Sequence, residues 1–110
     1  LVPDDGPIDF DHLRRMTLGD GGLEREVLAM FAGQAASLAA ALAQLPPDAA
    51  ALVHKLKGSA RAVGAVHVAA AAADLETALR NGTDAAGPRT ALDHAISQAG
   101  EAIDAILRRS

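Results

Sequence analysis

The residues best suited to chemistry in this sequence surround one histidine, His54, within the segment 52–64. A helix advances about 100° per residue, so the larger apolar residues of this segment fall on the side opposite His54. The imidazole is therefore predicted to face water. Lys57 and Arg61 follow on the same exposed face, and Gly58 comes one turn after the histidine. An exposed imidazole beside two cations and a glycine, which has no side chain, indicates a docking site where an anionic group reacts at the histidine.

Ala50 and Gly58 stand one turn before and one turn after His54. A glycine inside a helix costs about 0.5–1 kcal/mol relative to alanine, a cost that an alanine-rich chain could easily have avoided. Gly58 therefore predicts open space for a donor. Free imidazole is nucleophilic at neutral pH, and a phosphoryl group on a ring nitrogen stays a good leaving group. A surface histidine can thus accept a phosphoryl group and return it.

The second ring nitrogen of such a histidine needs a hydrogen-bond partner, and Glu76 is the best candidate. Gly64 is predicted to join two helices in a tight antiparallel hairpin, with His54 ten residues before it and Glu76 twelve after it. Residues about equally far from the turn face each other. A carboxylate on one ring N–H would fix the tautomer and make the other nitrogen more basic.

Several alternatives stay open beside this hypothesis. Arg80, four residues after Glu76, could pair with that carboxylate or add positive charge at the rim of the site. A metal centre is the main rival, but bundle metal sites use motifs such as Glu-x-x-His, and none occurs. A hydrolase lacks an evident nucleophile–base pair. His12, His67 and His94 are interpreted as solvated or locally satisfied side chains.

Cap and turn residues divide the chain into five expected helices, and no strand pattern competes with them. Asp9 and Asp48 are plausible N-caps, and Gly64 is a candidate left-handed C-cap. Clustered glycines predict a turn at 17–22. The expected helices are Phe10 to Met16, about Leu23 to Leu45, about Ala49 to Val63, about Val66 to Arg80, and Pro88 or Arg89 to Arg108.

The short connections force successive helices to lie antiparallel. We predict an all-α, antiparallel up-down bundle of four main helices with a short extra N-terminal helix. Residues 1–7 are expected to form a flexible lead and residues 8–110 one domain. Met16, Met30 and Phe31 are predicted to lie in the core.

Composition excludes several functional classes. A net charge of -4 and only two aromatic residues argue against nucleic-acid binding. No apolar run is long enough to span a bilayer, and no secretory signal is visible, so we expect no membrane insertion and a cytoplasmic location. The chain has no cysteine, and therefore neither a disulfide nor a thiolate metal site.

The segment His54-Lys55-Leu56-Lys57-Gly58-Ser59-Ala60, followed by Gly64-Ala65, closely resembles the signature of histidine-containing phosphotransfer (HPt) domains. The resemblance covers essentially the whole chain. It implies phosphorylation of His54, with Lys57 and Gly58 in the roles given above. Glu76 lies where such domains often place a Gln or Glu bonded to the active imidazole.

The resemblance also implies that a response-regulator receiver domain docks against the His54 face and the adjacent long helix. Gly58, Arg61, Ala50 and Arg80 are the residues expected at that docking surface. The leading hypothesis is a monomeric phosphorelay intermediate, loaded by a receiver aspartyl phosphate or by a histidine kinase. It would not be an enzyme, because no nucleotide-binding loop is present. No cofactor is expected, and any Mg²⁺ would belong to the partner. The alternative is a helical interaction module that binds a signalling partner without phosphoryl transfer.

Overall fold

Five helices make up the part of the chain that the computed structural model describes, residues 6–109. Within these residues there is no strand, which confirms the predicted all-helical class. Most of the predicted flexible lead lies outside the described residues and stays a prediction. The helices are α1 (Phe10–Met16), α2 (Gly21–Leu42), α3 (Ala49–Val63), α4 (Val66–Asn81) and α5 (Ala86–Arg108).

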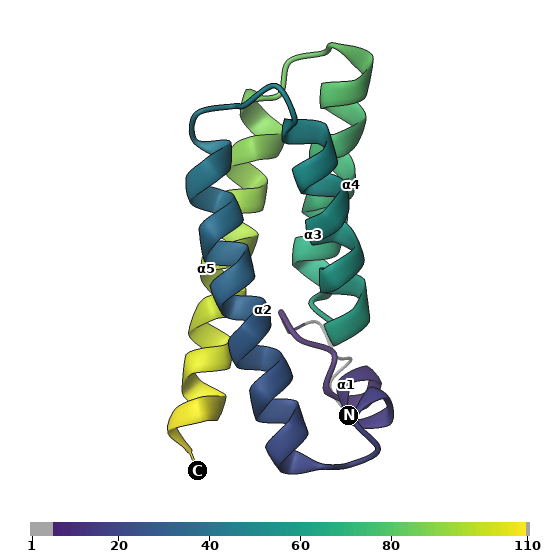
Figure 1. Cartoon of the computed structure of the whole chain (residues 1–110), viewed down its shortest axis with the longest axis vertical. Coiled ribbons are helices and arrows are strands. Elements are labelled where there is room, and N and C mark those ends of the chain that lie inside the picture. The colour runs from purple at the N-terminus through teal and green to yellow at the C-terminus, as the bar shows by residue number, and fades with distance from the viewer. Residues whose placement is uncertain (1–5, 110) are drawn as a thin grey trace.

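The four long helices lie side by side along the longest axis of the molecule, and α1 lies at one end of them (Figure 1). Helix α3 packs against α4, α4 packs against α5, and α2 contacts both α3 and α5. The four helices therefore close into a bundle that buries one face of each. Helix α1 contacts α3.

The core of the bundle combines leucine, isoleucine and valine with many alanines. Small residues such as Ala60, Ala72 and Ala99 are buried between the helices and allow their backbones to approach closely. The largest fully buried side chains are Ile8, Leu13, Leu28, Leu42, Leu56, Leu75, Leu92, Ile103, Val53, Val68 and Thr17.

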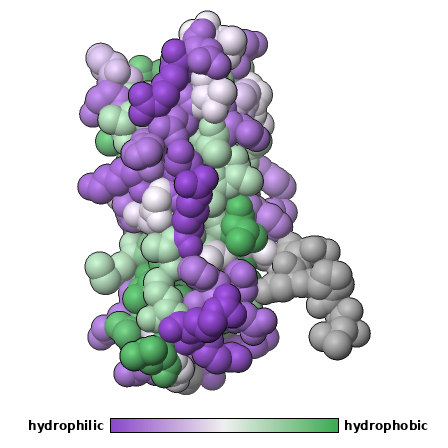
Figure 2. All heavy atoms as spheres, turned by 90° about the vertical axis from the view of Figure 1, so that its right-hand side faces the viewer, coloured by the Kyte–Doolittle hydropathy of each residue, from purple (hydrophilic) through white to green (hydrophobic). Residues whose placement is uncertain are grey.

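Three side chains were predicted to lie in the core, and the prediction is wrong for two of them. Phe31 is buried at 3% exposure, but Met30 is 75% exposed and Met16 is 40% exposed. The partners of α2 cover only the side that carries Leu28 and Phe31, and Met30 points away from that side because each residue turns by about 100°. Apolar side chains are therefore exposed on α1 and on the first half of α2. Figure 2 shows the larger hydrophobic patches of one face in its lower half, toward the end where α1 lies.

Side-chain caps set the beginnings of α1 and α2. Asp9 Oδ1 accepts a hydrogen bond from His12 N at 3.1 Å, as its predicted N-cap role requires. Asp48 occupies the N-cap position of α3, but its side chain makes no capping hydrogen bond. Helix α2 begins at Gly21 rather than Leu23, because Asp20 Oδ1 accepts a hydrogen bond from the Leu23 N–H.

The last helix also begins earlier than predicted. Asp84 Oδ1 accepts a hydrogen bond from the Ala86 N–H at 2.9 Å, so that α5 starts at Ala86 and Pro88 lies within its first turn. Helix α2 ends at Leu42, three residues before the predicted Leu45. Leu45 has a left-handed backbone with φ of 42° and is partly exposed.

The connection between α3 and α4 is as short as predicted. Gly64 has a φ of 82° and ends α3 as a left-handed C-cap. Its carbonyl accepts a hydrogen bond from Asp9 N at 2.7 Å, and His12 Nε2 donates to the Ala62 carbonyl at 3.0 Å. The chain around α1 thus satisfies carbonyl groups at the end of α3 and holds that end in place.

None of the helices within residues 6–109 combines the length and the apolar character needed to cross a membrane.

Candidate functional site

His54 lies in the middle of α3 and points away from the bundle core. Its neighbours Val53 and Leu56 are fully buried, whereas its own side chain is 62% exposed. The predicted orientation is therefore confirmed. The helical register that buries the apolar side of α3 is what presents the imidazole to solvent.

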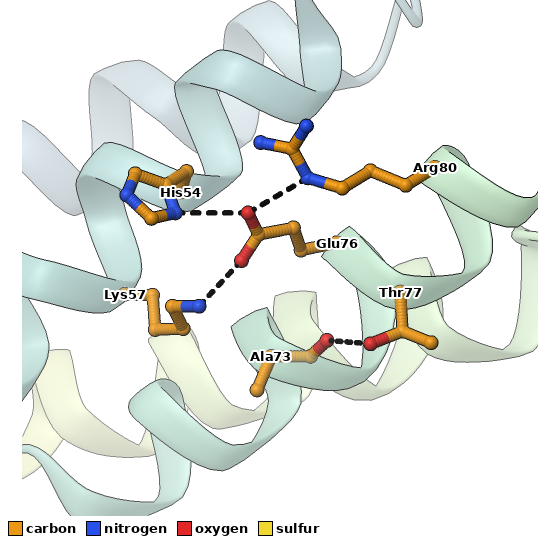
Figure 3. Close-up of polar contacts among 6 residues, drawn as sticks. All are labelled: His54, Lys57, Ala73, Glu76, Thr77 and Arg80. Carbon is orange, nitrogen blue, oxygen red and sulfur yellow. Dashed lines mark hydrogen bonds and ion pairs between the residues drawn. The ribbon is translucent and has the colours of Figure 1, made fainter.

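Glu76 on α4 reaches the imidazole from the neighbouring helix (Figure 3). Its Oε2 lies 2.8 Å from His54 Nδ1 and 3.0 Å from Arg80 Nε, and its Oε1 lies 2.6 Å from Lys57 Nζ. Only 7% of the residue is exposed. A single buried carboxylate thus accepts hydrogen bonds from two side chains of α3 and from one side chain of its own helix.

These contacts keep Glu76 ionised. Hydrogen bonding from Lys57 is the largest influence on the carboxylate, and Arg80 and His54 act in the same direction. Burial alone would raise the pKa, but the donors outweigh it and lower the pKa of Glu76 from 4.5 to about 2. At neutral pH the carboxylate is therefore an acceptor only.

The charge of Glu76 determines the tautomer of His54. Because an ionised carboxylate can only accept, His54 Nδ1 must carry the hydrogen of their hydrogen bond. In a neutral imidazole the other nitrogen, Nε2, then holds a free lone pair. Figure 3 shows Nδ1 directed at Glu76 and the second ring nitrogen on the opposite side of the ring. The site presents one nucleophilic nitrogen, in a fixed orientation, on an exposed surface.

Some of the basic residues around His54 pair with Glu76, and one is exposed to solvent. Lys57 is only 17% exposed on its side chain and donates to Glu76, so its positive charge lies one turn from the imidazole. Arg80, for which the sequence allows two roles, pairs with Glu76 through Nε. Arg61 is exposed, and its side chain has no ion-pair partner within the described part of the chain.

Gly58 is exposed beside His54, and a Cβ built on it would meet no heavy atom within 4 Å. Packing within the chain therefore does not require glycine at this position. Ala50, one turn before the histidine, is half-buried. The two small residues place no long side chain one turn before or one turn after the imidazole.

A groove between α2 and α3 was not predicted from the sequence. It has a volume of about 400 Å³, and its lining includes Met16 and Met30 from one side and Ser59 and Ala62 from α3. The available signal was the position of Met30, which follows Val27 by three residues and extends the apolar surface of α2 from the partly buried Val27 to an exposed position. An apolar groove therefore lies alongside the helix that carries His54.

Comparison with known proteins places this arrangement in a family. The family model described as Hpt domain matches residues 26–108. The chain belongs to the Hpt domain family. Hpt domains are helical phosphocarrier modules that carry out histidine phosphotransfer in two-component signalling and interact with kinases and receiver domains. Searches of curated protein sequences and of solved structures gave no significant match.

Proposed function

We propose that this Hpt domain accepts a phosphoryl group on Nε2 of His54 and exchanges it with an aspartate of a receiver domain. The observation that carries the proposal is the hydrogen bond between His54 Nδ1 and the ionised Glu76 carboxylate. It leaves the lone pair on the exposed nitrogen and stops the ring from rotating. Nε2 can then attack without first losing a proton.

The transfer step follows from this protonation state. The Nε2 lone pair attacks the phosphorus of a receiver aspartyl phosphate, the N–P bond forms and the P–O bond to the aspartyl oxygen breaks. The electron pair of the broken bond leaves with the aspartate as carboxylate. The ring keeps its proton on Nδ1 and becomes positive, and Glu76 stabilises that charge. Attack by an acceptor aspartate on the same phosphorus reverses the step.

Positive charge near His54 supports the same role. Lys57 and Arg80 already contact Glu76, and Arg61 is exposed two turns after the histidine. We infer that these cations offset the charge of the phosphoryl group and that Arg61 and Arg80 also contact the docked partner. Lys57 is best placed to shift from Glu76 toward a phosphoryl group, since both lie within its reach.

We infer that the receiver domain docks over the His54 face and the α2–α3 groove. The open space at Gly58 and the half-buried Ala50 admit a donor close to the imidazole. Exposed Met30 offers an apolar anchor in the groove. An antiparallel up-down arrangement of the four long helices, which is favoured by the ring of helix contacts, presents these features on one side.

The proposed carrier acts as a monomer in the cytoplasm and needs no cofactor of its own. Loading by a histidine kinase instead of a receiver uses the same nitrogen. Any Mg²⁺ and any nucleotide belong to the partner that supplies the phosphoryl group.

Transfer from a receiver carrying ³²P-phosphoaspartate tests the function. We expect acid-labile label on the wild-type chain and on the control His67→Gln, whose histidine is exposed on α4, but none on His54→Gln. Label that persisted in His54→Gln would refute the assignment of the site. Binding of a cognate receiver without any label on the wild type would instead favour the interaction module.

A further inference from the structure

A second pocket lies at the corner formed by α1, the first turns of α2 and the end of α5. It has a volume of about 470 Å³. Phe10 and Leu13 from α1, Leu28 from α2 and Ile106 from α5 line it with apolar surface. This size is within the range of pockets that bind ligands or anchor side chains. The corner pocket differs from the α2–α3 groove in the helices that form it.

Three arginines from three separate segments also line the corner pocket. They are Arg14 on α1, Arg25 on α2 and Arg109 directly after α5, and all three are exposed. None of these guanidinium groups has a hydrogen bond or ion pair with another side chain in residues 6–109. Glu24 lines the same pocket, but no ion pair joins it to them. An apolar pocket is thus surrounded by three arginines whose guanidinium groups have no side-chain partner in residues 6–109.

Most of the corner pocket lies outside the segment that the Hpt family model matches, residues 26–108. All of its lining from α1 precedes that segment, as does Arg25. The pocket also uses no residue of α3, which carries His54. A ligand here would therefore leave the exposed imidazole free, and the pocket has no evident part in phosphoryl transfer.

We propose that the corner pocket binds a short acidic segment of a partner protein, which inserts one apolar side chain between the arginines. Arginine matches carboxylates with paired hydrogen bonds, and three arginines from three segments suit several carboxylates better than one. Phe10, in the first turn of α1, is 39% exposed, and Leu23, in the first turn of α2, is 42% exposed. The first turns of α1 and α2, which both contribute to the pocket, thus carry exposed apolar side chains, and this suits a peptide chain with an apolar anchor and acidic neighbours.

Binding of a synthetic peptide, acetyl-Glu-Asp-Leu-Phe-Asp-Glu-amide, to the ¹⁵N-labelled full chain tests this proposal. We expect NMR shift changes confined to α1, the start of α2 and the end of α5, with saturation below about 1 mM. Arg14→Glu and Arg25→Glu should each weaken binding at least about tenfold, and raised salt should weaken it as well. The matched control is Arg15→Glu, since Arg15 is an exposed residue of the same helical turn as Arg14 but does not line the pocket.

The proposal would be overturned if about 1 mM peptide produced no shifts or if the shifts were centred on α3. An equal loss in Arg15→Glu, or equal binding of a peptide with lysines in place of the acidic residues, would also overturn it. Binding of decanoate in the corner without binding of the peptide would assign the pocket to a small amphipathic anion instead, and would also overturn it. Circular dichroism checks that each variant is folded. Arg14→Gln and Arg25→Gln, which remove the charge without reversing it, must give the same ranking as the reversal variants.

Discussion

Among individual side chains, Glu76 makes the contacts on which the site most depends. It must hold the His54 ring, neutralise Lys57 and pair with Arg80, all through two carboxylate oxygens. An amide at this position could still accept a hydrogen bond from Nδ1, but it would carry no charge to stabilise a positively charged ring. The carboxylate, rather than hydrogen bonding alone, is what the proposed transfer needs.

Glu76→Gln is therefore expected to slow phosphoryl transfer to His54 by about 10- to 100-fold, by analogy with the loss of carboxylates that orient metal-ligating histidines. The cause is loss of the negative charge that stabilises the ring once phosphorus is bound. Rapid-quench transfer from a phosphorylated receiver measures the rate, and circular dichroism checks the fold. A rate equal to that of the wild type would reduce Glu76 to a structural ion pair.

Glu76 also predicts a pH dependence of stability. Its pKa is lowered from 4.5 to about 2 in the folded chain, so the folded state favours the ionised form. The resulting stabilisation is fully present above about pH 4.5 and is lost as the pH falls through about 2. Urea unfolding of wild type and Glu76→Gln should give a difference in unfolding free energy that is constant near neutral pH and shrinks below pH 4.5. A difference that stayed the same down to pH 2 would contradict the lowered pKa.

Gly58 should separate stability from function. Gly58→Ala places a methyl group in open space and improves helix propensity, so the free energy of unfolding should rise by about 0.5–1 kcal/mol. The same methyl group lies one turn from His54, where the donor must approach, and should slow transfer. Gly100→Ala on α5, also without a neighbour within 4 Å, is the matched control and should leave transfer unchanged. Unaltered transfer in Gly58→Ala would show that the space is not used.

Among the helices, the α3–α4 hairpin decides whether His54 and Glu76 meet. Gly64 makes its connection possible in two ways. Its φ of 82° is a left-handed conformation, and a Cβ at this position would lie 2.8 Å from the Asp9 carbonyl oxygen. The turn therefore packs against the chain that leads into α1, and the end of α3 is fixed on both sides.

Gly64→Ala is expected to destabilise the domain by more than about 1 kcal/mol, through backbone strain and a clash with Asp9. Gly82→Ala is the matched control, because Gly82 ends α4 with a φ of 67° but a Cβ at that position would have nothing within 4 Å. The difference between the two variants in urea unfolding isolates the contact with Asp9. Equal losses in both would show that this contact contributes nothing.

The predicted and observed helix boundaries agree where a single local sequence signal sets the boundary. The end of α3 is predictable because Gly64 forms a left-handed cap, and its start at Ala49, two residues after Pro47, also agrees with the prediction. The predicted starts of α2 and α5 are wrong because glycine and proline are typical of loops. Asp20 and Asp84 instead bond the first N–H groups of those helices, and this stabilises turns that propensity alone disfavours.

Those features of the site that depend only on helical spacing were predictable from the sequence. The exposure of His54 follows from the register of α3, and its pairing with Glu76 follows from the length of the hairpin. The position of the Lys57 ammonium group did not follow, because a long flexible side chain has several rotamers within reach of different partners. The exposure of Met30 depends on which sides of α2 the other helices cover, and that is a property of the assembled bundle.

For the molecule as a whole, polar chemistry and apolar contact lie next to each other along α3. The Glu76 network lies toward α4, and the groove with Met30 lies toward α2. A receiver domain that covers His54 can therefore use the groove as an anchor. The proposed docking gives a role to the exposed side chains of Met16 and Met30, which line the groove.

Met30→Ala should weaken binding of the receiver domain at least about fivefold, since it removes the proposed anchor. Stability should change little, because the side chain is 75% exposed. Leu18→Ala is the control, as Leu18 is 93% exposed and does not line the groove. Isothermal titration calorimetry with the receiver domain measures both. Equal affinities for Met30→Ala and the wild type would place the docking surface elsewhere.

In the proposed transfer, the phosphoryl group is carried on Nε2 of His54 while Nδ1 stays bonded to Glu76. NMR of the phosphorylated chain with ¹⁵N-labelled histidines tests it directly, because one-bond ¹⁵N–³¹P coupling identifies the nitrogen that bears phosphorus. We predict coupling at a single nitrogen, Nε2 of His54, and a protonated Nδ1. Coupling at Nδ1, or at any other histidine, would contradict the proposed transfer through Nε2.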